Sequence, residues 1–385
     1  MKLRVFYRRE DGAVAVIVAL CMTALLGFTA LGVDFGMLAV SRQTLQNAAD
    51  AAALAGAGDL MNNENGSVMQ TVNDYCAANG CTPGIDGVSL DVQMTAKTVT
   101  VTLHREMVMG FSGVLTGKNR RTVTAAATAQ ALSFFAEYPY AIFAGKRIED
   151  SGTGIAVYGN DHPKVNGSIH SNSSITFADV TVRNGTVTAA GRIEPSIEGG
   201  RDNWPPKDMP DYDSFEASLS RQADIVEMPG DYIQNGTSCF KMLLDDAAKA
   251  YKRQYGREHG DQLTIHIGGS LIFNGWNPAT IQRDFPVTLI VDGDVSLNGA
   301  PLQGSLDFPV YVISKTGNIT IMGGALDFFG ILYAPKGDVT FMGINVNYYG
   351  SIIAQNFIKS GGTFHINYEE NLDRFLPKTK VRLIA

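Results

Sequence analysis

Residues 308–343 read FPVYVISKTGNITIMGGALDFFGILYAPKGDVTFMG, and the second half of this stretch repeats the first. The aromatic-led run FPVYVIS at 308–314 returns as FFGILYA at 328–334, and the glycine-led run GNITIMG at 317–323 returns as GDVTFMG at 337–343. Short runs of β-branched and aromatic residues between glycines are typical of strands joined by tight turns. A step of 20 residues that carries two such strands predicts stacked structural repeats.

The repeat extends in both directions along the chain. Glycine-led runs begin at Gly269, Gly293, Gly317, Gly337 and Gly361, and aromatic-led runs begin at Phe285, Phe308, Phe328 and Tyr348. Equivalent residues of successive turns of such a repeat stack ~4.8 Å apart, and each turn buries its faces against the next. We therefore predict a parallel β-solenoid over residues 261–371.

A shorter step precedes this region. The blocks NGSIHS, NSSITF, ADVTVR, NGTVTA and AGRIEP start six residues apart between Asn166 and Ala190. Three steps of six make one triangular turn, and NGSIHS is indeed followed by NGTVTA after eighteen residues. We predict that residues 152–198 form the first part of the same solenoid, and that residues 133–151 are a linker leading into it.

The segment between the two parts has a different composition. Residues 199–260 contain the proline-rich GGRDNWPPKDMPDYD and two helical patterns, at 214–224 and 240–257. We interpret this segment as a Pro-rich and helical insertion whose helices could cover a side or an end of the solenoid, because an uncovered end would leave unpaired backbone groups. Residues 372–385 are interpreted as a C-terminal tail.

The N-terminal part begins with a membrane-anchor pattern. Residues 13–33, AVAVIVALCMTALLGFTALGV, carry no charge, and as a helix they would be about 30 Å long, which matches the hydrocarbon core of a bilayer. Four basic residues precede them, so the positive-inside bias predicts that residues 1–12 are a cytoplasmic stub and that the rest is extracytoplasmic. A cleaved secretory signal is the alternative, but its apolar region would be shorter.

The helical pattern continues past Val33. One stripe of mostly small residues follows at alternating spacings of three and four, formed by Leu38, Ser41, Leu45, Ala48, Ala52 and Ala55. Small residues let helices approach closely, so this stripe is a helix-packing seam. Its partner could be the protein's own head domain or other subunits.

Residues 34–132 are predicted to form this helix extension and a small α+β head. The patterns indicate a helix at 67–79, strands at 88–94, 98–105 and 122–132, and a short helix at 107–115.

Charge and cysteine placement restrict the function further. The 385 residues carry a net charge of −7, and no basic run lies outside the N-terminus, which argues against nucleic acid as a partner. Cys76 and Cys81 flank an Asn-Gly turn signal and could close a small disulfide loop in an oxidising compartment. Free thiols are the alternative reading. A metal site would need further thiolates or histidines nearby, and we predict neither metal nor cofactor.

A polysaccharide-cleaving site is the enzymatic alternative. A hydrolase needs two carboxylates about 5 to 9.5 Å apart, whereas Asp294 and Asp338 occupy corner positions two turns apart, roughly 10 Å, with the amide of Asn318 between them. Such residues are more typical of turns, and we name no catalytic residues. The column Phe308, Phe328 and Tyr348 could stack on carbohydrate if it points outward, or form an internal ladder if it points inward. His266 alternates with inward apolar residues, which places it on the solvent side.

The N-terminal segment resembles that of the TadE/TadG-like Flp (Tad) pilus-assembly proteins. The shared features are the basic start with Gly12-Ala13, the Val33-Asp34-Phe35-Gly36 end of the apolar helix, and the alanine-rich stretch from Leu45 to Ala55. The resemblance implies a bitopic envelope protein with a pilin-like head that works with a pilus or secretion apparatus. Ile17 stands where prepilin-like members carry a glutamate, which favours the uncleaved, TadG-like form.

Residues 135–371 also resemble the right-handed β-helix domains that follow such anchors in bacterial envelope proteins, through their texture and the NGSIHSN motif. Together, these features predict a non-catalytic structural or assembly component of a Tad-type pilus in the bacterial cell membrane. Its expected partners are the lipid bilayer and pilus-assembly proteins or pilin-like subunits. The alternatives are a surface-displayed, adhesin-like module that binds a surface glycan and, third, a polysaccharide-acting enzyme.

Overall fold

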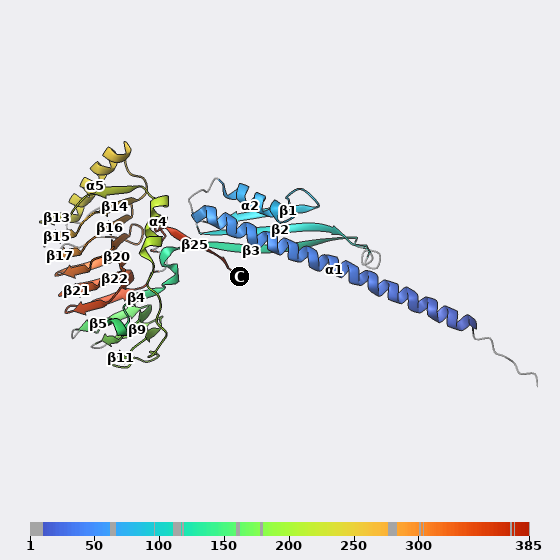
Figure 1. Cartoon of the computed structure of the whole chain (residues 1–385), viewed down its shortest axis with the longest axis horizontal. Coiled ribbons are helices and arrows are strands. Elements are labelled where there is room, and N and C mark those ends of the chain that lie inside the picture. The colour runs from blue at the N-terminus through green and yellow to red at the C-terminus, as the bar shows by residue number, and fades with distance from the viewer. Residues whose placement is uncertain are drawn as a thin grey trace, which may run out of the picture. The chain divides into compact units, whose positions relative to one another are not determined.

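The chain folds into two compact units (Figure 1). Unit 1 comprises residues 1–132 and 380–385, and unit 2 comprises residues 133–379, so unit 2 is inserted into unit 1. The computed structural model describes residues 11–61, 67–95, 97–110, 117, 119–158, 162–177, 180–275, 283–299, 302, 304–369, 372 and 374–384.

Unit 1 consists of a long helix, a short helix and a four-stranded sheet. The elements are α1 (Asp11–Met61), α2 (Val68–Ala78), β1 (Val88–Met94), β2 (Thr98–Val108), β3 (Arg120–Ser133) and β25 (Lys378–Ile384). The sheet has the order β1-β2-β3-β25, and β2 pairs antiparallel with both β1 and β3. The C-terminal segment, interpreted from sequence as a tail, therefore supplies an edge strand.

The core of unit 1 forms where the second half of α1 packs on α2 and β2. In β2 the alternate residues Val99, Val101 and Leu103 are fully buried, as expected for a strand with one covered face. A Cβ atom on Gly56 of α1 would lie only 2.9 Å from Val72 of α2, so glycine permits this close helix approach. The predicted helix at 67–79 and the three predicted strands are confirmed.

The predicted short helix at 107–115 is wrong where the structure describes it. Met107 and Val108 continue β2 and pair with Arg121 and Arg120 of β3. The apolar run alone does not distinguish a strand from a helix here, and cross-strand pairing decides for the strand. Residues 111–116 lie outside the described part.

Unit 2 is mainly β. Its N-terminal part contains β4 (Tyr140–Ala144), β5 (Ile155–Tyr158), β6 (Lys164–Asn166), β7 (Ser168–Ser171), β8 (Ile175–Phe177), β9 (Thr181–Arg183), β10 (Val187–Ala189) and β11 (Ile193–Glu194). Next come α4 (Tyr212–Gln222), β12 (Ile225–Met228), β13 (Tyr232–Asn235) and α5 (Cys239–Tyr255). The C-terminal part contains β14 (Leu263–Ile267), β15 (Leu271–Asn274), β16 (Val287–Val291), β17 (Val295–Asn298), β18 (Val310–Ser314), β19 (Ile319–Met322), β20 (Ala325–Ala334), β21 (Val339–Met342), β22 (Asn345–Ala354), β23 (Phe357–Ser360) and β24 (Phe364–Asn367).

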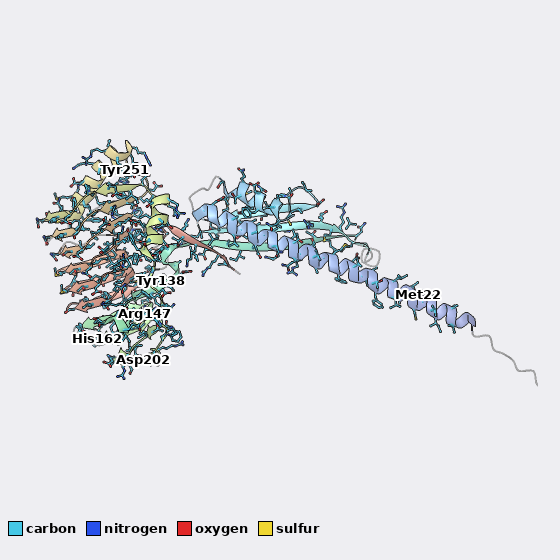
Figure 2. The ribbon with its side chains drawn as sticks, in the orientation of Figure 1. Met22, Tyr138, Arg147, His162, Asp202 and Tyr251 are labelled. Carbon is cyan, nitrogen blue, oxygen red and sulfur yellow. The ribbon has the colours of Figure 1, made fainter. Side chains whose placement is uncertain are left out.

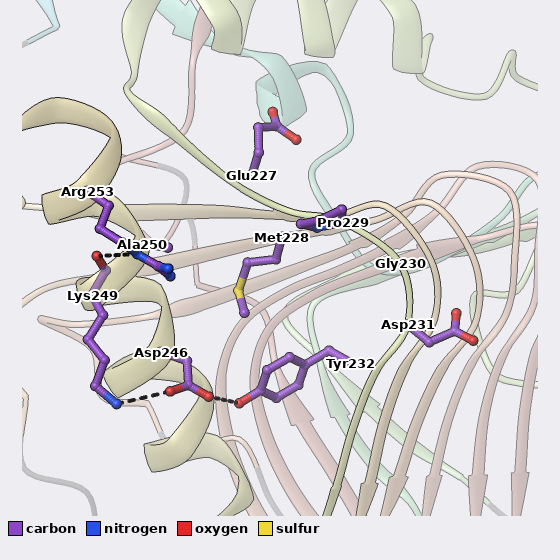
Figure 3. A pocket seen from close by; sticks show the side chains of 10 residues that line it. All are labelled: Glu227, Met228, Pro229, Gly230, Asp231, Tyr232, Asp246, Lys249, Ala250 and Arg253. Carbon is purple, nitrogen blue, oxygen red and sulfur yellow. Dashed lines mark hydrogen bonds and ion pairs between the residues drawn. The ribbon is translucent and has the colours of Figure 1, made fainter.

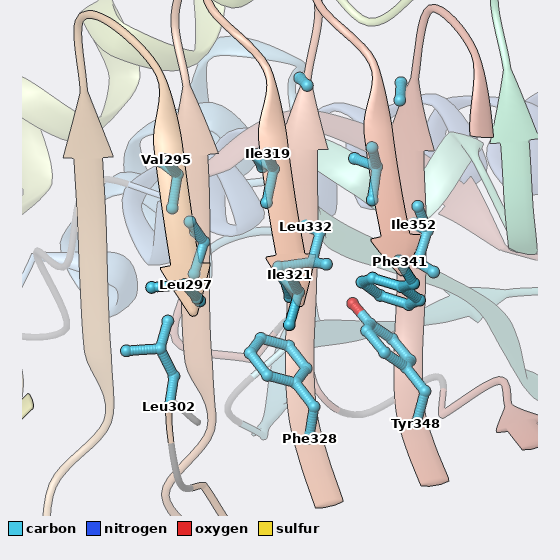
Figure 4. Close-up of a cluster of buried hydrophobic side chains, with 14 of the residues drawn as sticks. Val295, Leu297, Leu302, Ile319, Ile321, Phe328, Leu332, Phe341, Tyr348 and Ile352 are labelled. Atoms are coloured by element: carbon cyan, nitrogen blue, oxygen red, sulfur yellow. The ribbon is translucent and has the colours of Figure 1, made fainter. Parts of the chain in front are cut away.

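These strands form two parallel sheets with matching order. One sheet runs β10-β7-β4-β22-β20-β18-β16-β14-β12, and the other runs β11-β8-β5-β23-β21-β19-β17-β15-β13. Strands β24, β6 and β9 continue sideways from β22 in the first sheet. Apolar side chains of the two sheets meet between them, and Figure 4 shows Leu332 and Phe328 opposite Ile321 in this core.

The predicted repeat register is confirmed over most of unit 2. Val310 pairs with Gly330 and Gly330 with Gly350, which are steps of 20 residues. In the N-terminal part Ile169 pairs with Val187, a step of eighteen.

The glycine-led run at Gly361, however, was assigned to the wrong strand. Val339 of β21 pairs with Phe357 of β23, whereas the run after Gly361 forms β24, which pairs with β22. Gln355 and Asn356 take the places that glycine and aspartate hold in the preceding repeats.

The order in which the repeats stack differs from their order in the chain. The last repeat of the chain does not end the stack, because β22 and β23 pair with β4 and β5. Residues 133–151, predicted as a linker, therefore contain a central strand, β4. The segment 199–260, predicted as an insertion, supplies the edge strands β12 and β13.

The two predicted helices of this segment are confirmed, and they cover different parts of unit 2. Helix α5 contacts β12, β13 and β15 at one end of the stack (Figure 1). Its Phe240, Leu243 and Ala247 are buried in the core between the sheets. Helix α4 buries Phe215 and Leu219 in a second cluster, against Tyr311 and other side chains on the outer side of the larger sheet.

Candidate functional site

The first half of α1 is the most conspicuous surface of unit 1. Within the described residues, α1 is the helix that is long and apolar enough to cross a membrane, with a mean hydropathy of 2.5 in an 18-residue window that is entirely unburied. Large apolar side chains project from it on every side, among them Leu20, Leu25 and Phe28, and Met22 is visible in Figure 2. Among the described residues of unit 1, none buries this segment.

The helix-packing seam is used where α1 enters unit 1. Leu45, Ala48 and Ala52 are fully buried against the rest of the unit, and Leu38 and Ala55 are half-buried. Asp34, just after the apolar run, is buried and accepts a hydrogen bond of 3.3 Å from the backbone N–H of Gly110. The buried seam residues thus pack against the rest of unit 1. The exposed apolar residues of α1 lie nearer the N-terminus.

Cys76 and Cys81, for which the sequence left a disulfide and free thiols both open, are buried free thiols in this structure. Burial raises the pKa of Cys76 to about 11, and the neighbouring Cys81 adds to the increase. Burial also raises the pKa of Cys81, although the guanidinium of Arg105, 3.6 Å from its Sγ, opposes this effect. Both thiols are therefore protonated at neutral pH and are weak nucleophiles.

Two segments of the chain match known family models. Residues 12–59 match the model of the putative Flp pilus-assembly TadE/G-like family. This Tad segment covers both the exposed apolar stretch and the buried seam of α1, and the resemblance noted for the N-terminal sequence is confirmed over it. Residues 258–375 match a domain of unknown function, DUF7305. Nothing matches the chain among curated proteins or among solved structures.

In unit 2 the corner residues weighed as a catalytic pair form a hydrogen-bonded ladder. The backbone N–H of Asn318 donates to Asp294 Oδ1 at 2.7 Å, and the N–H of Asp338 donates to Asn318 Oδ1 at 2.9 Å. Asn356 donates to Asp338 Oδ1 through both its N–H and its Nδ2, at 3.1 and 2.8 Å. Each carboxylate or amide thus joins one repeat to the next, which is the turn role expected of these residues.

Two of the three residues of the aromatic column, Phe328 and Tyr348, point inward, and Phe308 is half-buried. Phe328 and Tyr348 are fully buried, and their rings stack with centroids 5.0 Å apart. His170 of the NGSIHSN motif is also fully buried; its Nδ1 lies 2.7 Å from Thr188 Oγ1 and its Nε2 lies 3.0 Å from Asn172 Oδ1. Burial lowers the pKa of His170. The contacts of these side chains are internal to unit 2 and stabilise its fold.

His266 lies between two carboxylates rather than facing open solvent. Its Nδ1 is 2.7 Å from Glu227 Oε2 and its Nε2 is 3.0 Å from Asp292 Oδ1. Burial lowers the pKa of His266, but the hydrogen bonds to Asp292 and Glu227 outweigh it and raise the pKa overall. The sequence pattern identified the outward direction of the ring but not its partners, which come from neighbouring repeats.

A pocket of about 300 Å³ lies beside α5 (Figure 3). Tyr232 Oη donates to Asp246 Oδ2 at 3.0 Å, and Lys249 Nζ lies 3.2 Å from Asp246 Oδ1. Burial raises the pKa of Tyr232, and the hydrogen bond to Asp246 adds to this. Because Lys249 and Asp246 form an ion pair and Tyr232 donates to the same carboxylate, we interpret the pocket as part of the contact between α5 and β13.

A second pocket, which we call the outer groove, has a volume of about 410 Å³ and lies over β22, β24, β6 and β9. Its lining residues are Lys164, Val165, Asn166, Thr181, Arg183, Asn184, Asn347, Tyr349, His365 and Asn367. The outer groove joins the two parts of unit 2, since β24 pairs with β6. Sequence reasoning missed it, because β24 and β6 lie about 200 positions apart in the chain and only their pairing brings the lining residues together.

Proposed function

We propose that this chain is a membrane-anchored, non-catalytic structural or assembly component of a Tad (Flp) type pilus or a related secretion apparatus. The observation that carries the proposal is the coincidence of the Tad match at residues 12–59 with a helix whose apolar first half is uncovered. Exposing so many large apolar side chains to water is unfavourable, at about 25 cal/mol for each Å². A bilayer, or a bundle of similar helices, would remove that cost.

We further infer a single-pass topology with the N-terminus in the cytoplasm. Lys2, Arg4, Arg8 and Arg9 precede the apolar stretch, and the positive-inside bias keeps such clusters in the cytoplasm. Unit 2 and the part of unit 1 beyond the apolar stretch would then lie outside the membrane. The exposed residues of α1 just past that stretch, such as Phe35 and Val40, would be available to partner subunits.

We also infer that unit 2 is a parallel β-helix. Three observations support this: the two sheets have matching strand order, successive strands of the repeats alternate between the sheets, and a third set of strands follows from β22. Such a domain would present a long, regular surface outside the membrane.

Membrane anchoring is tested by alkaline carbonate extraction of cells that express the tagged full-length chain. We expect the wild type to stay in the membrane pellet and the variant Leu25→Arg/Leu26→Arg to be released, because two charges at mid-helix oppose insertion. The matched control is Gln43→Arg/Asn47→Arg, two exposed positions beyond the apolar stretch, which should behave as wild type. Release of the wild type would contradict the anchor.

The role in pilus assembly is tested by shearing surface filaments and placing a photo-crosslinking residue at Val40, with Lys336 of unit 2 as the control position. We expect pilin subunits or assembly proteins to be captured from the filament or membrane fraction through Val40, and identified by mass spectrometry. Absence of the chain from both fractions, or identical capture from both positions, would reject the proposed role.

A further inference from the structure

We propose that the outer groove of unit 2 binds an acidic oligosaccharide. The groove is a face of side chains that point away from the core. In β22, for example, Tyr348 is fully buried while its neighbours Asn347 and Tyr349 line the groove. In-register pairing of the parallel strands repeats this alternation across β24, β6 and β9. The groove is therefore a built surface with a fixed order of side chains.

One side of the groove offers an aromatic platform. The rings of Phe329 and Tyr349 stack with centroids 4.6 Å apart and an interplanar angle of 4°. Both side chains are half-buried, so they keep an accessible edge, unlike the fully buried pair one position earlier. Tyr349 lines the groove, and the accessible part of its ring together with its hydroxyl suits the apolar and hydroxyl groups of a sugar ring.

The other side of the groove carries positive charge. Lys164 of β6 and Arg183 of β9 are both exposed, and among the described residues neither forms an ion pair with a carboxylate. Two unpaired cations on a chain with a net charge of −7 are a local exception to its overall sign. They favour a ligand that brings carboxylates, because charge-assisted hydrogen bonds are the strong ones.

Amide and imidazole groups lie between the platform and the cations. Asn367 pairs across strands with Tyr349 on one side and Asn166 on the other, and His365 lies beside them on the same strand. The Nδ1 atom of His365 is buried without a hydrogen-bond partner. Amides both donate and accept, as a row of sugar hydroxyls requires. Strands ~4.8 Å apart let successive sugar units meet successive side chains.

The test uses the full-length chain in lipid nanodiscs and isothermal titration calorimetry. The probes are oligogalacturonate, oligoglucuronate and a sialylated oligosaccharide, together with the methyl-esterified form of the first. We expect saturable binding of at least one acidic probe that weakens with added salt and is at least about tenfold tighter than binding of the ester.

Two variants assign the binding to the groove. Lys164→Gln/Arg183→Gln should weaken binding of the acidic probe about tenfold or more while leaving binding of the ester unchanged. Tyr349→Ala should weaken binding of both forms. The matched controls are Lys336→Gln/Arg192→Gln and Tyr158→Ala, which remove exposed side chains of the same kinds elsewhere in unit 2 and should bind as wild type. Thermal unfolding checks that all variants are folded.

Several outcomes would overturn the proposal. The first is that no acidic probe shows saturable binding, and the second is that the control variants lose as much affinity as the groove variants. The third is equally tight binding of a single-stranded oligonucleotide of the same charge, which would indicate a general polyanion surface. None of these outcomes bears on the pilus proposal, which rests on the Tad segment.

Discussion

At the scale of single residues, Asn356 joins the two parts of unit 2. It continues the corner ladder from Asp338, and its Oδ1 accepts a hydrogen bond of 2.9 Å from the backbone N–H of Gly154, in the N-terminal part. Gly154 has a φ of +74°, and a Cβ atom there would lie 2.1 Å from the carbonyl oxygen of Ser174, so only glycine fits. The amide of Asn356 is therefore a specific connector between distant segments.

We expect Asn356→Ala to lower the free energy of unfolding of unit 2 by about 2 kcal/mol, because it leaves the buried N–H of Gly154 without its partner and removes the Nδ2 hydrogen bond to Asp338. For a domain of this size the melting temperature should fall by about 4–8 °C, measured by calorimetry on the full chain in detergent. Asn235→Ala, at the exposed end of a separate asparagine ladder, is the control and should have a smaller effect. Equal shifts for the two variants would contradict the connector role.

His266 should make the stability of unit 2 depend on pH. Its pKa is raised in the folded state, so its protonated form is favoured there. The stabilisation is complete below the pKa of the unfolded chain, about 6.5, and is lost as pH rises through the higher folded pKa. We expect the difference in melting temperature between wild type and His266→Gln to be larger at pH 5.5 than at pH 8.5. A difference that grows with pH would reverse the assignment.

At the scale of elements, α5 replaces a missing strand. It sends Tyr255 and Gln254 to the free edge of β12, where Tyr255 Oη donates to the carbonyl of Ile225 at 2.9 Å and accepts from its N–H at 3.2 Å. Gln254 Nε2 donates to the same carbonyl at 3.0 Å. Side chains of a helix thus satisfy edge groups that would otherwise be open to pairing with another chain.

We expect Gln254→Ala/Tyr255→Phe to lower the free energy of unfolding by about 2 kcal/mol and to increase aggregation on heating, because the edge of β12 loses its cover. Differential scanning calorimetry and light scattering measure the two effects. Arg253→Ala changes a neighbouring exposed residue of the same helix and serves as the control. Unchanged aggregation in the double variant would show that burial by Phe240 and Leu243 is sufficient.

The periodicity of the sequence predicted where most strands lie, but it did not always predict which strand pairs with which. The steps of 20 and eighteen residues located the paired strands, because inward side chains must recur at each turn. The predicted pairing of the run after Gly361 is wrong, because a glycine indicates a turn between two strands but does not indicate which sheet the next strand joins. The outer groove was missed for the related reason that its Lys164 and His365 face each other only through tertiary pairing.

At the scale of the whole molecule, the N-terminal and C-terminal parts of unit 2 meet in the middle of its stack of strands. β4 and β5, the first strands of unit 2, pair with β22 and β23, which lie about 200 residues later in the chain. Because no local pattern specifies which strands meet at such a junction, the sequence predicted two parts of one solenoid but not the order in which they stack. Contacts over so many residues also slow folding, since loop closure precedes them.

A truncated chain of residues 1–344, which lacks β22 to β25, should therefore aggregate. It would leave β4 and β5 on one side, and β20 and β21 on the other, with unpaired edges. Size-exclusion chromatography in detergent measures this, with residues 1–377 as the control that keeps every strand of the two parallel sheets. A monodisperse 1–344 fragment with an intact circular dichroism spectrum would show that the two parts fold independently.

The insertion of unit 2 into unit 1 also has a mechanical consequence. The chain leaves unit 1 after β3 and returns in β25, and these two strands are neighbours in one sheet. A pull on unit 2 would be shared by two connections to unit 1, a covalent one through β3 and one through the hydrogen-bonded strand β25. If a proteolytic cut severed the connection after β3, unit 2 would stay attached to unit 1 through the hydrogen bonds of β25 in the sheet.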